Sequence, residues 1–248
     1  MPLTERQRQV PAFPVLRTPR LELRELTVAD APWYLAHFSD PEIVHGTGFP
    51  AQDGIAGALD EMDTYVIGLF ERREGIRWGL VLAGTETLVG TAGIFRWADG
   101  PEPAAEIGYD LAPAWWGRGL MAEALVAIVD YAFGMLGLVR LEAWVLDGND
   151  RSCRTLERTG FRHTGLLPAH GEDEHGVLRD EHRYELRPPA NGDGRVLDGG
   201  GAEGRSTSSG GEMPPVATAF VYDPAADTLA ARFTPRGRGR KLTAANGG

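Results

Sequence analysis

Two glycines enclose an arginine in Gly117-Arg118-Gly119, where a strand-like pattern gives way to a helical one. Glycine leaves backbone N–H groups uncovered, and the first turn of a helix favours negative charge. Arg118 adds a cation to the same place. The loop therefore has the chemistry of a pyrophosphate-binding site, although a sharp turn that binds nothing would also need glycine.

The same loop satisfies the dinucleotide fingerprint G-x-G-x-x-G/A through Gly117, Gly119 and Ala122. In dinucleotide-binding folds this turn follows its strand directly, whereas here residues 113–116 intervene. Glu142 lies roughly 20 residues further on, as the fingerprint asks, but inside a predicted strand and not at its end. No Gly-Lys-Ser/Thr follows, which excludes a Walker-type loop. An NAD-dependent oxidoreductase is therefore a minor alternative.

The carboxylate of Glu106 lies in the largely apolar strand pattern AEIGYDL, just before this loop. Burial in apolar surroundings would raise its pKa toward the value that a general base needs at neutral pH. We predict that Glu106 takes a proton from a nucleophile, directly or through water. An outward-facing strand carboxylate is the alternative.

The bulk composition restricts the class of protein. The chain has 248 residues, a formal net charge of −10 and one cysteine. It lacks the apolar run of roughly 18 residues that would suggest a membrane helix. These features predict a cytoplasmic protein without a membrane partner. The acidic body argues against nucleic acid as the main ligand and would attract a cationic partner such as an amine, with plain solubility as the alternative.

Hydrophobic periodicity predicts the order of the elements. Leu21 and Leu23 alternate with charged residues in a first strand, and Thr27-x-x-Asp30 resembles a helix N-cap. Further elements are expected as a helix at about 53–73, a hairpin over 77–98, a strand over 104–112, a helix over 120–136, a strand over 139–148, a helix over 149–160 and strands at about 161–167 and 177–186. The order β-α-α-β-β-β-α-β-α-β-β predicts a mixed α/β sheet.

Two of these helices carry clear local signals. In the first, an apolar stripe runs through Leu120, Ala124, Leu125, Ile128, Ala132 and Leu136. In the second, Asn149 stands at the expected N-cap and Gly160 just past the expected end.

The two ends of the chain differ from this body in composition. Residues 1–15 are expected to be a flexible N-terminus, 188–212 a Gly-rich linker, and 213–248 a low-complexity basic tail with a hairpin around Asp223-Pro224. The RG pairs of the tail could contact RNA or an acidic surface; a solvated tail is the other interpretation. Residues 16–187 are then the one folded domain.

Four separated segments of this domain resemble the GNAT superfamily of acetyl-CoA-dependent N-acetyltransferases, in the branch that contains the ribosomal-protein alanine N-acetyltransferases. They are LRTPRLELRELTVADA, AEIGYDLAPAWWGRGLMAEAL, NDRSCRTLERTGF and GVLRDEHRYEL. The resemblance implies a sheet with a splayed central strand pair. It also implies acetyl transfer from acetyl-CoA to a primary amine, without a metal.

The resemblance also assigns the glycine loop to the pyrophosphate of acetyl-CoA. The superfamily pattern Gln/Arg-x-x-Gly-x-Gly/Ala falls on Trp116, Gly119 and Met121, so the first and last places depart from it. The next small residue is Ala122. The expected cofactor-binding residues are Leu111, Trp116, Gly117, Arg118, Gly119, Leu120, Met121, Ala122 and Asn149.

The implied mechanism needs a base, oxyanion support and a proton for the departing thiolate. By resemblance, Glu106 is the base, the backbone N–H near Leu111 supports the oxyanion, Asn149 contacts the pantetheine arm and Ser152 lies near the sulfur as proton donor. Cys153 would offer a ping-pong route through an acyl-cysteine. It follows Ser152 directly and points to another side of the helix, so we expect direct transfer in a ternary complex.

The acceptor is left open at this point. By resemblance, Trp33, Tyr34 and the helix at 53–73 form part of its wall, and the carboxylates near Asp173 in the turn GEDEHG would attract an ammonium group. A metal site or a merely solvated turn are alternatives for that segment. A protein N-terminus is the preferred acceptor. A polyamine, an antibiotic, or a non-catalytic acyl-CoA-binding regulatory module remain alternatives.

Overall fold

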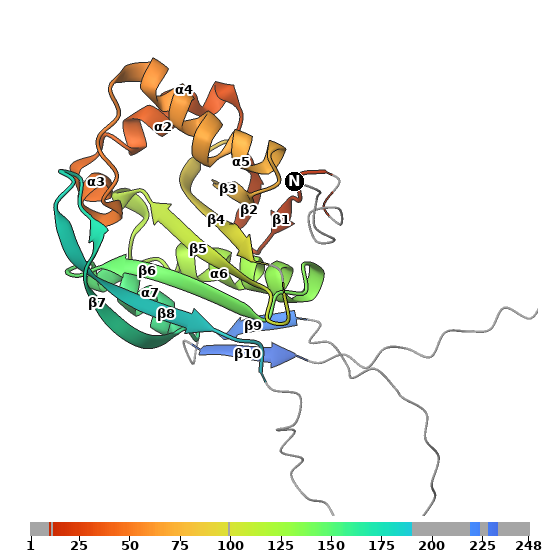
Figure 1. The fold of residues 1–248 in the computed structure, drawn as a ribbon. Helices are drawn as coiled ribbons and strands as arrows, with labels where there is room; N and C mark the ends of the chain where they lie inside the picture. Colours follow the sequence, from red (N-terminus) through yellow and green to blue (C-terminus); the bar gives the residue numbers. More distant parts are fainter. Residues whose placement is uncertain (1–9, 11, 99, 190–218, 224–227, 233–248) are drawn as a thin grey trace, which may run out of the picture.

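A computed structural model describes residues 10, 12–98, 100–189, 219–223 and 228–232. Eight strands form one sheet in the order β1-β2-β3-β4-β5-β6-β8-β7, and β9 and β10 form a separate antiparallel pair. Helices cover both faces of the large sheet (Figure 1). The expected flexible N-terminus, linker and basic tail lie largely outside the described residues.

The strands are β1 (Leu16–Arg17), β2 (Leu21–Glu25), β3 (Gly75–Leu82), β4 (Leu88–Ala98), β5 (Ala104–Leu111), β6 (Arg140–Leu146), β7 (Arg162–Glu172), β8 (Leu178–Leu186), β9 (Ala219–Asp223) and β10 (Thr228–Arg232). The helices are α2 (Ala31–His37), α3 (Pro41–Thr47), α4 (Gly54–Tyr65), α5 (Ile67–Glu71), α6 (Leu120–Asp130) and α7 (Asp150–Arg158), with short helical turns at Val28–Asp30, Pro113–Trp115 and Tyr131–Met135. The predicted mixed α/β order is confirmed.

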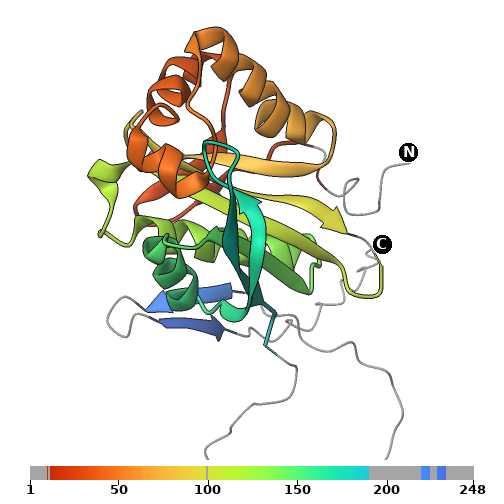
Figure 2. The same ribbon diagram turned by 60° about the vertical axis from the view of Figure 1, so that its left-hand side comes forward.

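The two faces of the sheet bury separate apolar cores. Along β3, Ile76, Trp78 and Leu80 enter the core that contains α6 and α7, whereas Val81 enters the core formed with α2 and α4. This alternation is the period of a strand that is buried on both faces. Figure 2 shows α2–α5 gathered above the sheet, away from α6 and α7.

The centre of the sheet is open at one end. β5 and β6 are parallel and pair only from Ala104↔Arg140 to Glu106↔Glu142. Beyond Glu106 the strands part, while β5 stays paired with β4 as far as Leu111. The predicted splayed strand pair is therefore present, and the cleft described below begins there.

The helix α6 continues into a π-helical turn, Tyr131–Met135, and together they cover most of the expected 120–136 span. All six residues of the predicted apolar stripe are buried. The predicted helix at 53–73 is two helices, α4 and α5, because the backbone leaves the helical region at Val66.

Sequence analysis missed the short helix α3. Asp40 caps it by accepting a hydrogen bond from the Glu42 N–H, Pro41 opens it and Gly48 ends it in the left-handed region. The hairpin of β7 and β8 reaches over this helix, where His45 lies 3.4 Å from Glu174. Helix α3 and the hairpin lie at the same end of the sheet (Figure 1), and both contribute residues to the wall of the cleft described below.

Candidate active site

A cavity of about 920 Å³ lies where β5 and β6 part. It is lined by the second half of β5, the loop after it, β6, α7 and the end of α3. We call it the first cavity. Among the predicted site residues, it brings together Glu106, Leu111, Trp116, Gly117, Gly119, Leu120, Met121, Ala122, Asn149 and Ser152.

The glycine loop, residues 116–122, enters α6 through two left-handed backbone positions. Gly117 has φ 72° and Gly119, the N-cap of α6, has φ 70°. Side chains other than glycine rarely adopt this conformation, which explains the residue type. The N–H groups of the first helical turn have no partner inside a helix, so those after Gly119 are available to an anion. A Cβ built on Gly117 meets nothing within 4 Å, so the loop is open.

Residues from the start of the domain hold this loop in place. Glu123, in the first turn of α6, accepts hydrogen bonds from the Thr18 hydroxyl at 2.6 Å and from Arg20 Nε at 2.6 Å. Arg20 Nη1 also donates to the Arg118 carbonyl at 2.9 Å. Two of the segments that carried the family resemblance therefore meet here, which sequence spacing did not reveal.

The tryptophans before the loop also have defined places. Trp116 Nε1 donates to the Leu111 carbonyl at 2.5 Å, which fixes the loop to the end of β5. The Arg151 guanidinium lies over the Trp116 ring at 3.2 Å, and that of Arg118 over Trp115 at 4.7 Å. Trp116, which departs from the superfamily pattern, thus links the glycine loop to β5 and α7.

The backbone of Leu111 faces the gap between β5 and β6. The Ala112 N–H bonds to the Val89 carbonyl, so the neighbouring pair Gly90↔Leu111 is of the non-hydrogen-bonded kind. In such a pair the N–H and C=O groups point away from the partner strand. The Leu111 carbonyl accepts the hydrogen bond from Trp116 Nε1. The Leu111 N–H points away from β4, toward the gap where the first cavity lies.

Two hydroxyl groups meet on the α7 side of β5. The Tyr109 hydroxyl lies 2.9 Å from Ser152 Oγ, and both residues line the first cavity. Burial raises the pKa of Tyr109, so this phenol stays protonated. Tyr109 was not predicted, and only its place within the quoted strand pattern hinted at it.

Asn149 is the N-cap of α7, as predicted. Its side-chain oxygen accepts from the Ser152 N–H at 3.1 Å. Its Nδ2 donates to the Gly46 carbonyl at the end of α3, at 2.7 Å. The residue therefore joins α7 to the wall that α3 forms.

Glu106 lies on the opposite face of β5 from Tyr109. Its two oxygens accept from Arg96 Nη1 at 3.1 and 3.0 Å, and its side chain is partly exposed to the first cavity. The apolar surroundings expected from the strand pattern are not found, because Arg96 comes from the neighbouring strand β4. The carboxylate is nevertheless open to a ligand in the cleft.

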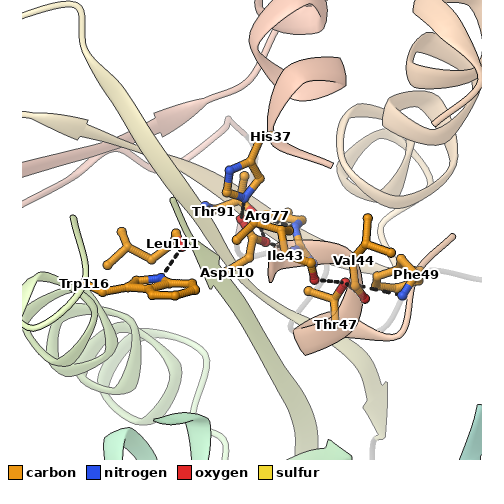
Figure 3. Close-up of polar contacts among 10 residues, drawn as sticks. All are labelled: His37, Ile43, Val44, Thr47, Phe49, Arg77, Thr91, Asp110, Leu111 and Trp116. Atoms are coloured by element: carbon orange, nitrogen blue, oxygen red, sulfur yellow. Dashed lines mark hydrogen bonds and ion pairs between the residues drawn. The ribbon is translucent and has the colours of Figure 1, made fainter. Parts of the chain in front are cut away.

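A buried charge network is centred on Asp110, which lies on the same face of β5 as Glu106; Figure 3 shows Asp110 with His37, Arg77 and Thr91. Asp110 accepts from Arg77 Nη2 at 2.6 Å and from the Thr91 hydroxyl at 2.5 Å, and lies 2.7 Å from His37 Nε2. Burial alone would raise the pKa of Asp110, but His37, Arg77 and Thr91 lower it to about 2. The carboxylate is therefore ionised and ties α2 to β3, β4 and β5.

A second cavity of about 560 Å³ adjoins the first on the α2–α5 side. Four residues line both cavities: Phe49, Arg77, Phe95 and Arg96. The wall includes the predicted Tyr34 and also Glu61, whose pKa is raised because burial outweighs the opposing effect of the Arg77 charge. Trp33 instead stacks on His37 with centroids 4.6 Å apart, so it supports this wall from behind.

Asp173 lies in the tight turn between β7 and β8. It accepts from the backbone N–H groups of His175 and Val177, and those bonds, led by that of Val177, lower its pKa. It lines neither cavity described above. Within the described ranges, no cluster of three or more His, Cys, Asp or Glu is arranged to hold a metal ion. None of the helices there is long and apolar enough to cross a membrane.

Comparison with known proteins places this cleft in a family. Residues 20–162 match the model of the acetyltransferase (GNAT) domain. The uncharacterized N-acetyltransferase YoaA of Bacillus subtilis (strain 168) is 34% identical over 177 residues, covering 71% of this chain and 98% of the relative. The ribosomal protein uS5-alanine N-acetyltransferase of Escherichia coli (strain K12) is 28% identical over 165 residues, covering 60% and 79%.

A solved structure has a similar fold to this chain. RimJ of Mycobacterium smegmatis, in complex with CoA-disulfide, superposes with a TM-score of 0.63 at 23% identity. The match covers 72% of this chain and 88% of that one.

Proposed function

The chain belongs to the acetyltransferase (GNAT) family, and from that premise we propose that this N-acetyltransferase acetylates the N-terminal amine of a protein. One observation carries the proposal. The cleft runs from the glycine loop through the splay of β5 and β6 into the second cavity, where Phe49, Arg77, Phe95 and Arg96 join the two spaces. A chain end can enter along it while its amine reaches the splay. The relative from Escherichia coli is named for an N-terminal alanine of a ribosomal protein, which supports the same acceptor.

The residues present fit acetyl-CoA at the other end of the cleft. The open N–H groups after Gly119 suit the pyrophosphate. Along α7, three arginines also line the first cavity: Arg151, Arg154 and Arg158. Guanidinium groups are well matched to phosphate oxygens. When bound there, acetyl-CoA would supply the acetyl group as a thioester.

The proposed chemistry uses the two faces of β5. Glu106 takes the proton of the incoming amine, directly or through water, because an amine at neutral pH is mostly protonated. The Leu111 N–H, directed into the cavity, stabilises the oxyanion that forms as the amine attacks. Ser152 gives its proton to the departing thiolate and takes up the second proton that the amine nitrogen loses as the intermediate collapses, while the Tyr109 hydroxyl orients Ser152. Nitrogen thus gains the acetyl group and sulfur gains a proton in one ternary complex.

The first test is thermal unfolding of the full chain with acetyl-CoA and, separately, with NAD. A ligand at about 100 times its dissociation constant adds roughly 2.7 kcal/mol to the free energy of unfolding. We expect acetyl-CoA to raise the midpoint and NAD to leave it unchanged. A shift with NAD alone would overturn the family chemistry for this cleft.

The second test is thiol release with a panel of tetrapeptides that differ in their first residue, with spermidine and an aminoglycoside for comparison. We expect turnover with the peptides. Glu106→Gln and Ser152→Ala should reduce this turnover while acetyl-CoA binding persists. Turnover with the small amines alone would show that the acceptor is a small amine and not a protein N-terminus. Binding without turnover on any amine would favour the regulatory module.

A further inference from the structure

Arg77 belongs to a row of three residues across β3, β4 and β5 in which the other two are glycines. Arg77 on β3 stands opposite Gly93 on β4, which stands opposite Gly108 on β5. Opposite residues of antiparallel strands share a face, and the contacts of Arg77 with Thr91 and Asp110 place this row on the α2–α5 face. Gly93 and Gly108 place no side chain of their own in this row, but the ring of Phe95, from β4, lies against Gly108 and lines the first cavity there.

The Arg77 guanidinium is held rigidly at Thr91 and Asp110, the next pair of residues on the same face of β4 and β5. Its Nε donates to the Thr91 hydroxyl at 2.8 Å, and its Nη2 to Asp110 at 2.6 Å. The side chain therefore leans from β3 across β4 toward β5. Its third nitrogen, Nη1, donates to no described residue, and Arg77 lines both cavities. Because Asp110 balances its charge, Arg77 offers the cleft a fixed hydrogen-bond donor with little net positive charge.

The position of this donor suits the first residue of a peptide. Arg77 reaches as far as Asp110 on β5 and lines both cavities, so Nη1 lies near their junction. The first carbonyl oxygen of a peptide is three bonds from its N-terminal nitrogen, and a hydrogen bond spans about 2.9 Å, so an amine at the free edge of β5 and a carbonyl at Nη1 can belong to one residue. Glu106, on the same face of β5, is then beside the amine.

We propose that Arg77 is the residue that selects the acceptor, by donating a hydrogen bond from Nη1 to the first carbonyl oxygen of the incoming peptide. The inference rests on the proposed function and deepens it. The acceptor class is a primary amine that carries a carbonyl on the next carbon. An alkyl polyamine has no carbonyl oxygen to accept a hydrogen bond from Arg77.

The experiment compares two acceptors that differ in that carbonyl. One is an alanine-first tetrapeptide amide, and the other is isopropylamine, which keeps the alanine methyl and amine but lacks the carbonyl. Arg77→Lys keeps a cation beside Asp110 and loses the planar group. Loss of one hydrogen bond to a charged donor predicts a drop of about 10- to 100-fold in kcat/KM for the peptide. For isopropylamine, and for the KM of acetyl-CoA, we expect less than about a threefold change.

A matched control is Arg72→Lys. Arg72 lines the second cavity as well, but its three nitrogens are engaged by Glu74 and by the carbonyls of Asp63 and Thr64. We expect it to leave the ratio of the two acceptors unchanged. An equal loss on both acceptors in Arg77→Lys would mean a merely structural role, and no loss would mean no role. Either result overturns the proposal.

The wild-type chain provides a test that does not depend on folding of the variant. The same tetrapeptide with its first peptide bond replaced by CH₂–CH₂ should react about 10- to 100-fold more slowly than the natural peptide. Equal rates would overturn the role of Arg77 while leaving acetyl transfer intact. Failure of every amine would instead overturn the proposed function.

Discussion

At the cofactor end of the cleft the glycine loop is a run of consecutive residues, whereas the acceptor end draws His37, Arg77 and Asp110 from three separate elements. The loop works mainly through backbone N–H groups, which glycine exposes. The acceptor end works through buried charges that exist only once α2, β3 and β5 have met. A local feature with a distinctive residue pattern can be recognised in a sequence, and an assembled one cannot.

This difference predicts that damage at the acceptor end reaches the whole fold. Asp110→Asn removes the charge that balances Arg77 and should lower the free energy of unfolding by about 3–5 kcal/mol, because a buried cation is left without its partner. Urea unfolding measures this. The control is Glu22→Gln, which breaks the exposed Arg17–Glu22 pair and should cost less than about 1 kcal/mol.

The loss of stability in Asp110→Asn should also depend on pH. The pKa of Asp110 is lowered to about 2 from 3.8, so its stabilisation is complete above pH 3.8 and is lost as pH falls toward 2. The difference between wild type and Asp110→Asn should therefore shrink by about 2 kcal/mol across that window. A difference that stays constant down to pH 2 would show that folding does not lower the pKa of this carboxylate.

The next largest effect is on the rate of catalysis, at Ser152 between β5 and α7. Ser152→Ala should lower kcat by about 100-fold, the range expected for losing a proton donor, with the KM for acetyl-CoA nearly unchanged. Cys153→Ala, at the adjacent position, should keep its kcat. Loss of turnover in the Cys153 variant, with a burst of acyl-enzyme in wild type, would instead indicate a ping-pong route.

A smaller loss is expected for Tyr109→Phe, which removes only the hydroxyl that contacts Ser152. Its kcat should fall by about tenfold, because the donor loses orientation but is still present. If the two hydroxyls act as one unit, adding Tyr109→Phe to Ser152→Ala should change nothing further. Additive losses in this double-mutant cycle would show that the two hydroxyls act independently.

The smallest effect concerns the loop itself. Gly119→Ala forces a side chain into the left-handed region and should weaken acetyl-CoA binding about fivefold, measured by calorimetry. Gly134→Ala is the matched control, because Gly134 has no positive φ and a Cβ there meets nothing within 4 Å. If both variants bind acetyl-CoA equally well, the conformation of Gly119 is not what the cofactor end requires.

Sequence analysis followed the same division between local and assembled features. The buried stripe of α6, the Asn149 cap and the hairpin of β3 and β4 were predicted, since each depends on neighbouring residues. Helix α3 was missed, although Asp40-Pro41 and Gly48 mark its ends, because its seven residues are too few for a periodic pattern.

Partners of the site residues could not be predicted. Glu106 was expected in apolar surroundings, and Arg96 lies against it because β4 happens to place an arginine there. Nothing in the order of residues 37, 77, 91 and 110 indicates that their side chains meet. The roles of Glu106, Leu111, Asn149 and Ser152 stay predictions, although the first cavity brings all four together.

The hydrogen bonds that hold Glu123 have a consequence for how the chain folds. Thr18 and Glu123 are 105 positions apart, so the glycine loop is fastened by a segment made long before it. Contacts of such separation pay a loop-closure entropy and form late in folding. Helix α6 can form early from its own apolar stripe, but competence to take up acetyl-CoA should arrive only when the first strands dock. Recovery of cofactor binding during refolding should therefore lag behind recovery of helical signal.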